Sequence, residues 1–252
     1  MSLKRLGGRI AIVTASTDGI GFAIAQRLAR EGAKVIVSSR KAKNVENATQ
    51  KLSKEGLEVT GLVCHVSNAE DRKKLFDEAK KLGGLDILVS NAAVNPEMGG
   101  VLDCSESSWD KIFEVNVKSS FLLAKEALPL LRQSKVGRII FISSIAGFQP
   151  MNVLGAYSVS KTALLGLVKA ASIQLASEGI TVNAVCPGII ATKFSSAITA
   201  DDTKDIAIAQ IPLGRFGKSE DIGASVAYLA SDDGTYVTGE NLVVAGGMVS
   251  RL

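Results

Sequence analysis

The sequence predicts an α/β fold in which one doubly wound parallel sheet of about seven strands carries helices on both faces. Two observations lead to this prediction: short runs rich in valine and isoleucine alternate with longer amphipathic stretches, and no linker or repeat interrupts them. The chain has 252 residues, of which 46% are hydrophobic and 21% are charged. This composition excludes disordered and fibrous classes and predicts one domain over residues 1–252.

The expected strands are short runs without charge in their interiors, at 9–15, 34–39, 57–64, 85–89, 138–143, 181–186 and 241–244. Both faces of such a strand must be covered, which is typical of a parallel sheet. The amphipathic stretches between them are the expected helices, at 20–31, 43–55, 70–82, 106–131, 156–178 and 219–231. Residues 192–212 break the alternation, and we expect them to form a substrate lid at the carboxyl edge of the sheet.

Charge and residue counts exclude several classes of function. The net charge is 29 − 25 = +4 without a basic block, which argues against a nucleic-acid-binding protein. His65 is the only histidine, so a multi-histidine metal site is excluded, and no metal site is expected. Cys64, Cys104 and Cys186 lack C-x-x-C spacing and are expected to be thiols in a reducing compartment. The longest uncharged stretch, 139–160, is too polar to span a membrane.

A glycine-rich turn follows the first expected strand and leads into a helix. Residues 14–21 read T-A-S-T-D-G-I-G, in which Gly19 and Gly21 allow a ligand to approach the backbone closely. Amide groups and the positive end of the helix would face a pyrophosphate there. Ser39, Arg40 and Lys41 end the second strand without the acid that binds an NAD ribose. A guanidinium suits a 2′-phosphate and predicts NADP(H), although a merely solvated strand end is the alternative.

Tyr157 and Lys161 are four residues apart, so a helix places them on the same face. An ammonium group at that position would lower the pKa of the tyrosine and make it a usable general acid or base. Ser144 lies 13 residues earlier, at the end of an apolar strand, where its hydroxyl reaches the same cleft. A surface pair on an amphipathic helix is the alternative interpretation.

Several spaced motifs follow one another along the chain. They are Thr14 with Gly19-Ile20-Gly21, Asn91-Ala92-Ala93, Asn116-Val117, Ser143-Ser144, Tyr157 with Lys161, Pro187-Gly188 with Ile190 and Thr192, and Pro212-Leu213-Gly214-Arg215. In these motifs and in their order the chain resembles, over nearly its whole length, the short-chain dehydrogenase/reductase family. The resemblance implies that family's Rossmann-type fold and nicotinamide cofactor.

The resemblance also implies roles for individual residues. Tyr157 would donate or accept the proton, and Ser144 would hold the substrate oxygen. Lys161 would bind the nicotinamide ribose and tune Tyr157, and Asn116 would anchor a water that links Lys161 to solvent. The residues expected to bind NADPH or NADP are Thr17, Gly19, Ile20, Gly21, Ser39, Arg40, Lys41, His65, Val66, Asn91, Ala92, Tyr157, Lys161, Pro187, Gly188, Ile190 and Thr192.

Three positions depart from the family pattern. Ala15 replaces the first glycine of the turn, and we expect its backbone to be accommodated without a positive φ. Ala93 replaces the glycine of N-A-G, and His65 stands where many members place an aspartate against adenine. Together with the last residues, Ser250-Arg251-Leu252, the chain resembles a subgroup of peroxisomal NADPH-dependent carbonyl reductases.

The expected activity is therefore the NADPH-dependent reduction of aldehydes, ketones, dicarbonyls, quinones or retinal to alcohols. Apolar side chains in 94–100, 148–154 and 194–211 favour a small apolar carbonyl substrate. Two alternatives remain open: a 3-oxoacyl thioester reductase and a non-catalytic NADPH-binding sensor. The resemblance also implies a homotetramer, and an import receptor that reads residues 250–252, with a peroxisomal location and a cytosolic fraction. By itself, the tripeptide is better explained as an ordinary chain end.

Overall fold

The computed structural model describes residues 4–195, 199 and 201–248, so Ser250-Arg251-Leu252 lie outside the described residues. Their strands form one sheet in the order β3-β2-β1-β4-β5-β6-β7, and every neighbouring pair is parallel. The predicted fold class is confirmed. The strands are β1 Ile10–Val13, β2 Lys34–Ser39, β3 Val59–Val63, β4 Ile87–Ser90, β5 Arg138–Ile142, β6 Thr181–Pro187 and β7 Asn241–Val244.

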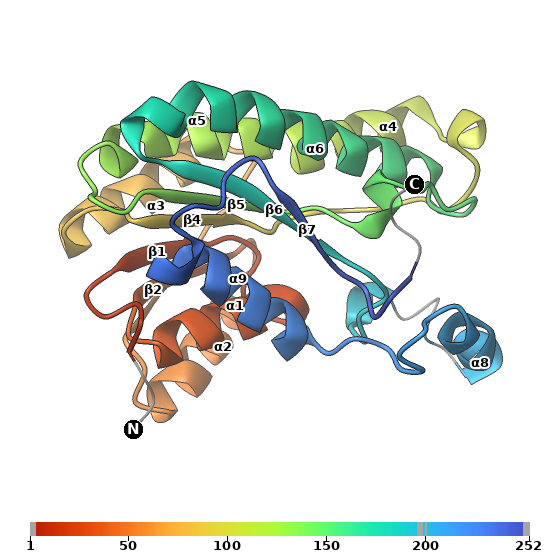
Figure 1. Ribbon diagram of the computed structural model, residues 1–252, viewed down its shortest axis with the longest axis horizontal. Helices are drawn as coiled ribbons and strands as arrows, with labels where there is room; N and C mark the ends of the chain where they lie inside the picture. The colour runs from red at the N-terminus through yellow and green to blue at the C-terminus, as the bar shows by residue number, and fades with distance from the viewer. Residues whose placement is uncertain (1–3, 196–198, 200, 249–252) are drawn as a thin grey trace.

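Helices cover the sheet on both faces, as Figure 1 shows. One face carries α1 (Gly19–Arg30), α2 (Ala42–Lys54) and α9 (Ser219–Ala230). The other face carries α3 (Ala69–Leu82), α5 (Ser119–Leu131), α6 (Gly155–Leu175) and, in line with α5, α4 (Glu106–Phe113). The remaining helical turns are η1 Val101–Asp103, η3 Ile145–Gly147, η4 Ala176–Glu178, η5 Lys193–Ser195 and η6 Asp232–Gly234.

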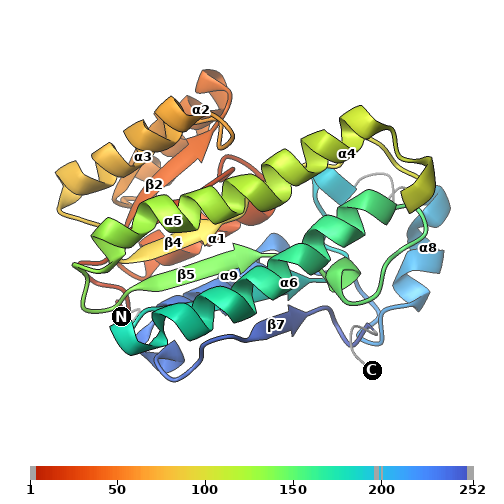
Figure 2. The same ribbon diagram turned by 90° about the horizontal axis from the view of Figure 1, so that it is seen from above.

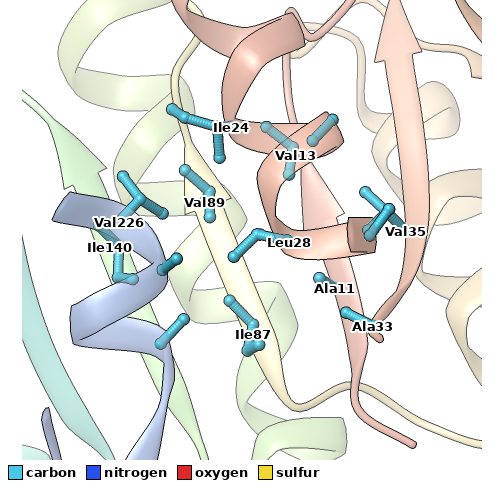
Figure 3. Close-up of a cluster of buried hydrophobic side chains, with 14 of the residues drawn as sticks. Ala11, Val13, Ile24, Leu28, Ala33, Val35, Ile87, Val89, Ile140 and Val226 are labelled. Carbon is cyan, nitrogen blue, oxygen red and sulfur yellow. The ribbon is translucent and has the colours of Figure 1, made fainter. Parts of the chain in front are cut away.

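Strand alternation divides the core into two layers. In β1, Ala11 and Val13 face the layer of α1 and α9, whereas Ile12 faces the opposite layer. Figure 3 shows Val13, Val89 and other strand side chains gathered with Leu28 of α1. Leu28 is fully buried, and burying a leucine side chain stabilises a fold by about 1.5–3 kcal/mol. The interiors of the strands lack charged residues because side chains on both faces of the sheet are covered by helices.

The helix predicted over 106–131 is present without a break, and its middle winds differently from an α-helix. A π-helical segment, η2 (Glu114–Lys118), joins α4 to α5. Ser119 Oγ donates to the Glu114 carbonyl at 2.8 Å, and Ser120 Oγ donates to the Asn116 carbonyl at 2.8 Å. Serine hydroxyls that bond to carbonyls of the preceding turn locally disturb the helical ladder. A π-helical turn contains one more residue than an α-helical turn, and the pattern of hydrophobic residues does not reveal it.

The predicted lid region, 192–212, contains η5 and the helix α8 (Asp201–Ala209). Figure 2 shows that α8 lies away from the sheet, on the side toward which β5 and β7 point. Parallel strands bring their carboxyl ends to this edge, and the strand order reverses between β1 and β4. A ligand crevice is expected at such a switch point. Among the described helices, none has the length and apolar character needed to cross a bilayer.

Candidate active site

The glycine-rich turn between β1 and α1 has a strained residue at its start. Ala15 has a φ of +50°, and it is the non-glycine residue with positive φ among the described residues. The expectation that Ala15 would avoid a positive φ was therefore wrong. Six residues later, a Cβ on Gly21 would collide with the Ala15 carbonyl oxygen and come within 2.5 Å of Asn91 Nδ2. Gly21 is therefore required by close backbone packing.

Asn91, directly after β4, holds this turn in place. Its Nδ2 donates to the carbonyl oxygen of Thr14 at 3.0 Å and to that of Ala15 at 3.1 Å. In return, Thr14 Oγ1 accepts the backbone amides of Asn91 at 3.0 Å and Ala92 at 3.2 Å. These four bonds tie the end of β1 to the end of β4, and they explain how the structure retains the strained Ala15.

Asp18 caps the first turn of α1. Its Oδ1 accepts the Gly19 amide at 2.9 Å, and its Oδ2 accepts Lys193 Nζ at 2.6 Å. The Lys193 hydrogen bond lowers the pKa of Asp18, so the carboxylate is charged at neutral pH. Gly19, with a φ of +52°, turns the chain into the helix, whose amides suit a pyrophosphate. Thr17, also predicted to bind cofactor, is half-buried and does not line the cavity.

The ends of β2 and β3 lie beside the turn. Ser39 is the last residue of β2, and Arg40 and Lys41 follow it as exposed residues. Arg40 forms no ion pair within the described part of the chain, so its guanidinium can meet a ligand. His65 and the buried Val66 follow β3. These residues do not line the cavity that holds Tyr157; they lie at the carboxyl ends of two paired strands.

His65 is neutral at physiological pH. Burial lowers its pKa, and the nearby charges of Lys111 and Arg40 lower the pKa further. Its Nδ1 accepts the Ser67 amide at 3.3 Å, so the proton of the neutral ring is on Nε2. The neutral imidazole ring therefore adds no charge beside Arg40.

Tyr157, near the start of α6, is buried and lies in the cavity with Ser144, which follows β5. Burial raises the pKa of Tyr157, and a hydrogen bond with Ser144 opposes the rise. The pKa was expected to fall because of Lys161, and in this structure it does not. The Tyr157 hydroxyl is consequently protonated at neutral pH and can donate a proton.

Lys161 lies one turn further along α6 and is 2% exposed. Its Nζ donates to the Ile142 carbonyl at 2.8 Å and lies 5.4 Å from the centre of the Tyr157 ring. Burial lowers the pKa of Lys161 to about 8. The predicted Tyr157–Lys161 pair is thus on the buried face of α6, which disfavours the surface-pair alternative.

Asn116, in the π-helical segment, is fully buried and does not line the cavity. Its Oδ1 accepts the Val94 amide at 2.8 Å, and its Nδ2 donates to the Val94 carbonyl at 3.0 Å and to Ser160 Oγ at 3.0 Å. Ser160 Oγ in turn donates to the Tyr157 carbonyl at 2.6 Å. Asn116 therefore connects the loop after β4 to the helix that carries Tyr157.

One cavity of about 360 Å³ joins the turn, the strand ends and the tyrosine. Predicted residues in its wall include Ile20, Asn91, Pro187, Gly188, Ile190 and Thr192, whereas Ala92 is outside it. The apolar end was predicted only as loop ranges. The structure selects Asn95, Met98, Met151, Leu154 and Phe194 from these ranges and adds Ile145 and Lys193. Contact of loops distant in sequence brings these side chains together, so periodicity could not identify them.

The described residues contain no group of side chains arranged as ligands of a metal ion. Within residues 4–195, 199 and 201–248, no three histidine, cysteine, aspartate or glutamate side chains gather as metal ligands would. Cys64 and Cys186 are buried, and Cys104 is half-buried; none of them forms a disulfide within this part of the chain.

Comparisons with known proteins agree with the fold. Residues 14–249 match a family model described as enoyl-(acyl carrier protein) reductase. The chain is 50% identical over 249 residues to dehydrogenase/reductase SDR family member 4 of Oryctolagus cuniculus, covering 98% of this chain and 96% of that protein. The corresponding human protein is also 50% identical, with 98% and 90% covered.

A plant relative and a solved structure extend the similarity. Tropinone reductase-like 3 of Erythroxylum coca is 50% identical over 251 residues, covering 99% of this chain and 96% of that protein. A crystal structure described as a gluconate dehydrogenase from Agrobacterium tumefaciens superposes with a TM-score of 0.94 at 27% identity, with both chains fully covered. The chain therefore belongs to the short-chain dehydrogenase/reductase family of nicotinamide-dependent oxidoreductases.

Proposed function

We propose that this chain is an NADPH-dependent carbonyl reductase in which residues 1–252 form one cofactor-binding domain. One observation carries the proposal: Tyr157, Ser144 and the glycine-rich turn line the same cavity. A nucleotide cofactor and a carbonyl compound would meet in that cavity beside a protonated phenol. The relatives named as reductases support the same class of reaction.

The residues present fit a dinucleotide. Gly21 lets α1 pack closely against Ala15 and Asn91, and the amides at the start of α1 would face a pyrophosphate. Pro187, Gly188, Ile190 and Thr192 would hold the nicotinamide end, since they line the cavity beside Tyr157 and Lys161. When bound, NADPH supplies the hydride.

The protein's own groups would orient the substrate and deliver the proton. The Ser144 hydroxyl would donate a hydrogen bond to the carbonyl oxygen of the substrate. Tyr157 would act as the general acid, because its raised pKa keeps the proton on the phenol until the oxygen gains charge. Lys161, buried beneath the ring, would hold the ribose and stabilise the phenolate that remains. Asn116 would keep α6 in register with the loop after β4.

The preference for NADPH over NADH is part of the proposal. Arg40 is exposed at the end of β2 and unpaired within the described residues. Neutral His65 beside it leaves the site without a carboxylate at that position. A 2′-phosphate would therefore find an available guanidinium and no repelling charge.

The substrate would be a small apolar carbonyl compound. Met98, Met151, Leu154 and Phe194 line the end of the cavity near Tyr157, and the Phe194 ring centre lies 5.8 Å from that of Tyr157. These side chains suit aldehydes, ketones, dicarbonyls, quinones or retinal better than small carboxylic acids.

A 3-oxoacyl thioester reductase is the second candidate, and the family model described as enoyl-(acyl carrier protein) reductase favours it. Turnover of NADPH with aromatic dicarbonyls, acetoacetyl thioester and retinal separates the two. Faster turnover of the thioester would overturn the first proposal in favour of the second. Absence of turnover with every substrate, despite NADPH binding, would indicate the non-catalytic sensor.

Assembly as a homotetramer is a further part of the proposal. Apolar side chains remain exposed on the outer helices, including Phe121 of α5 and Ile173 of α6, which are 46% and 80% exposed. Exposed apolar side chains on neighbouring helices favour contact with another subunit. Light scattering should give a particle near four times the 26.3 kDa chain mass. A 26.3 kDa particle at micromolar concentration would contradict it.

A peroxisomal location with a cytosolic fraction stays a prediction, as does recognition of Ser250-Arg251-Leu252 by an import receptor. Deleting Leu252 from a fusion with an N-terminal fluorescent protein should leave activity intact and make the signal diffuse. A punctate signal after the deletion would show that the tripeptide is not the address.

A further inference from the structure

An ion pair crosses the cavity between the glycine-rich turn and the lid. Lys193 Nζ lies 2.6 Å from Asp18 Oδ2, and both residues belong to the cavity wall. The other Asp18 oxygen accepts the amide of Gly19, the first residue of α1, at 2.9 Å. The Asp18 carboxylate thus accepts hydrogen bonds from the ammonium group of Lys193 and from an amide at the positive end of a helix. An ammonium group and helix N-terminal amides are also the groups that commonly bind a phosphate.

We propose that Lys193 binds the pyrophosphate of the nicotinamide cofactor, and that Asp18 holds Lys193 in place until the pyrophosphate replaces it. The inference rests on the proposed function, because it assumes that the cavity takes a dinucleotide. It adds a residue of the lid to the cofactor-binding set and gives the acidic residue of the turn a role.

The start of the lid already lies beside the turn. A Cβ on Gly19 would come 3.3 Å from the side-chain atom Cγ2 of Thr192. Lys193 follows Thr192 directly, so its ammonium group starts beside the first turn of α1.

The charges favour the exchange. The side chains of Lys193 and Asp18 are 91% and 63% exposed, so water screens their attraction and the pair separates easily. A pyrophosphate brings two negative charges to the helix end, whereas Asp18 brings one. Its arrival would attract Lys193 more strongly and repel Asp18. The hydrogen bond between the two residues raises the pKa of Lys193 and lowers that of Asp18, so both carry charge at neutral pH.

Binding measurements on the purified full-length chain test the proposal. NADPH and NADH are titrated into wild type and Lys193→Met, and the dissociation constants are read from the cofactor's fluorescence. We expect Lys193→Met to weaken binding of both cofactors by about three- to tenfold, because both carry the pyrophosphate. Adenosine 2′-monophosphate lacks the pyrophosphate, so its dissociation constant should be unchanged. Lys204→Met is the matched control, since Lys204 is an exposed lysine of α8 outside the cavity wall.

A second substitution separates direct binding from charge neutralisation. Asp18→Asn keeps an oxygen for the Gly19 amide and removes the competing charge. It should tighten NADPH binding about two- to fivefold, and Lys193→Met should weaken binding by a similar factor in this background. If Lys193→Met no longer weakens NADPH binding in the Asp18→Asn background, Lys193 serves only to neutralise the charge of Asp18, and the proposal is wrong. Unchanged cofactor binding in Lys193→Met also overturns it. Failure of wild type to bind either cofactor would instead overturn the proposed function and the inference together.

Discussion

The side-chain amide of Asn91 donates a hydrogen bond to the carbonyl oxygen of Ala15 at 3.1 Å, across the gap between β4 and β1. Ala15 has a φ of +50°, a conformation that costs an L-residue roughly 1–2 kcal/mol relative to ordinary helical geometry. Asn91, 76 positions away in the sequence, therefore helps to hold the glycine-rich turn in a backbone conformation that alanine rarely adopts.

Replacing Ala15 with glycine should therefore raise stability. We expect the free energy of unfolding of the Ala15→Gly variant to increase by about 0.5–1 kcal/mol in urea denaturation, because glycine adopts positive φ readily. Ala170 is an exposed residue inside α6, so Ala170→Gly should instead lower stability by about 1 kcal/mol. Equal destabilisation at both positions would contradict strain at Ala15.

Removing the phenol should abolish most of the turnover. Tyr157→Phe keeps the ring but deletes the proton, so kcat should fall by about 10²–10⁴ while the dissociation constant for NADPH stays constant. Tyr228→Phe is the matched control, because Tyr228 lies on α9 outside the cavity wall. Substantial turnover by Tyr157→Phe would show that another group supplies the proton.

Arg40 should determine the choice of cofactor. Arg40→Ala should raise the KM for NADPH about ten- to hundredfold and leave the KM for NADH unchanged, since only NADPH has a 2′-phosphate. Lys34→Ala removes an exposed cation at the opposite end of β2 and should have no such effect. The same ratio of the two KM values in Arg40→Ala and wild type would exclude Arg40 as the determinant.

Lys161 should make the cofactor-free protein more stable as the pH rises. Burial lowers its pKa to about 8 in the folded chain, against 10.5 for an ordinary lysine. Between these values the unfolded chain binds a proton that the folded chain does not, so stability increases with pH. The difference in unfolding free energy between wild type and Lys161→Met should therefore shift in favour of wild type from about pH 8 to about pH 10. A constant difference over this range would mean that Lys161 stays charged when folded.

The sheet could be predicted from the sequence because each strand is a short apolar run without charge in its interior. A run without charge in its interior, such as 138–143, has to be covered on both faces, and β5 occupies Arg138–Ile142, all but the last residue of that run. Tyr157 and Lys161 could be placed on one face of a helix because their spacing alone decides it. The ends of strands were less predictable, since the expected strand 9–15 stops at Val13, where the turn held by Asn91 begins.

Long-range contacts explain what could not be predicted. No sequence pattern near Glu114 predicts the π-helical segment. In the structure, serine hydroxyls donate to backbone carbonyls there, and Asn116 is buried against Val94 and Ser160. The pKa of Tyr157 likewise depends on burial by several loops more than on the neighbouring lysine, so the expected fall became a rise.

By itself, the sequence determined the order of strands and helices, the glycine turn and the helical pairing of Tyr157 with Lys161, because these follow from period and backbone chemistry within a few residues. Only the tertiary structure decided that Ala15 takes a positive φ, that Asn91 fixes it, and that Asp18 meets Lys193. Each of these depends on groups 76 or 175 positions apart. Contacts of that separation form when the carboxyl ends of the strands are brought to one edge of the sheet.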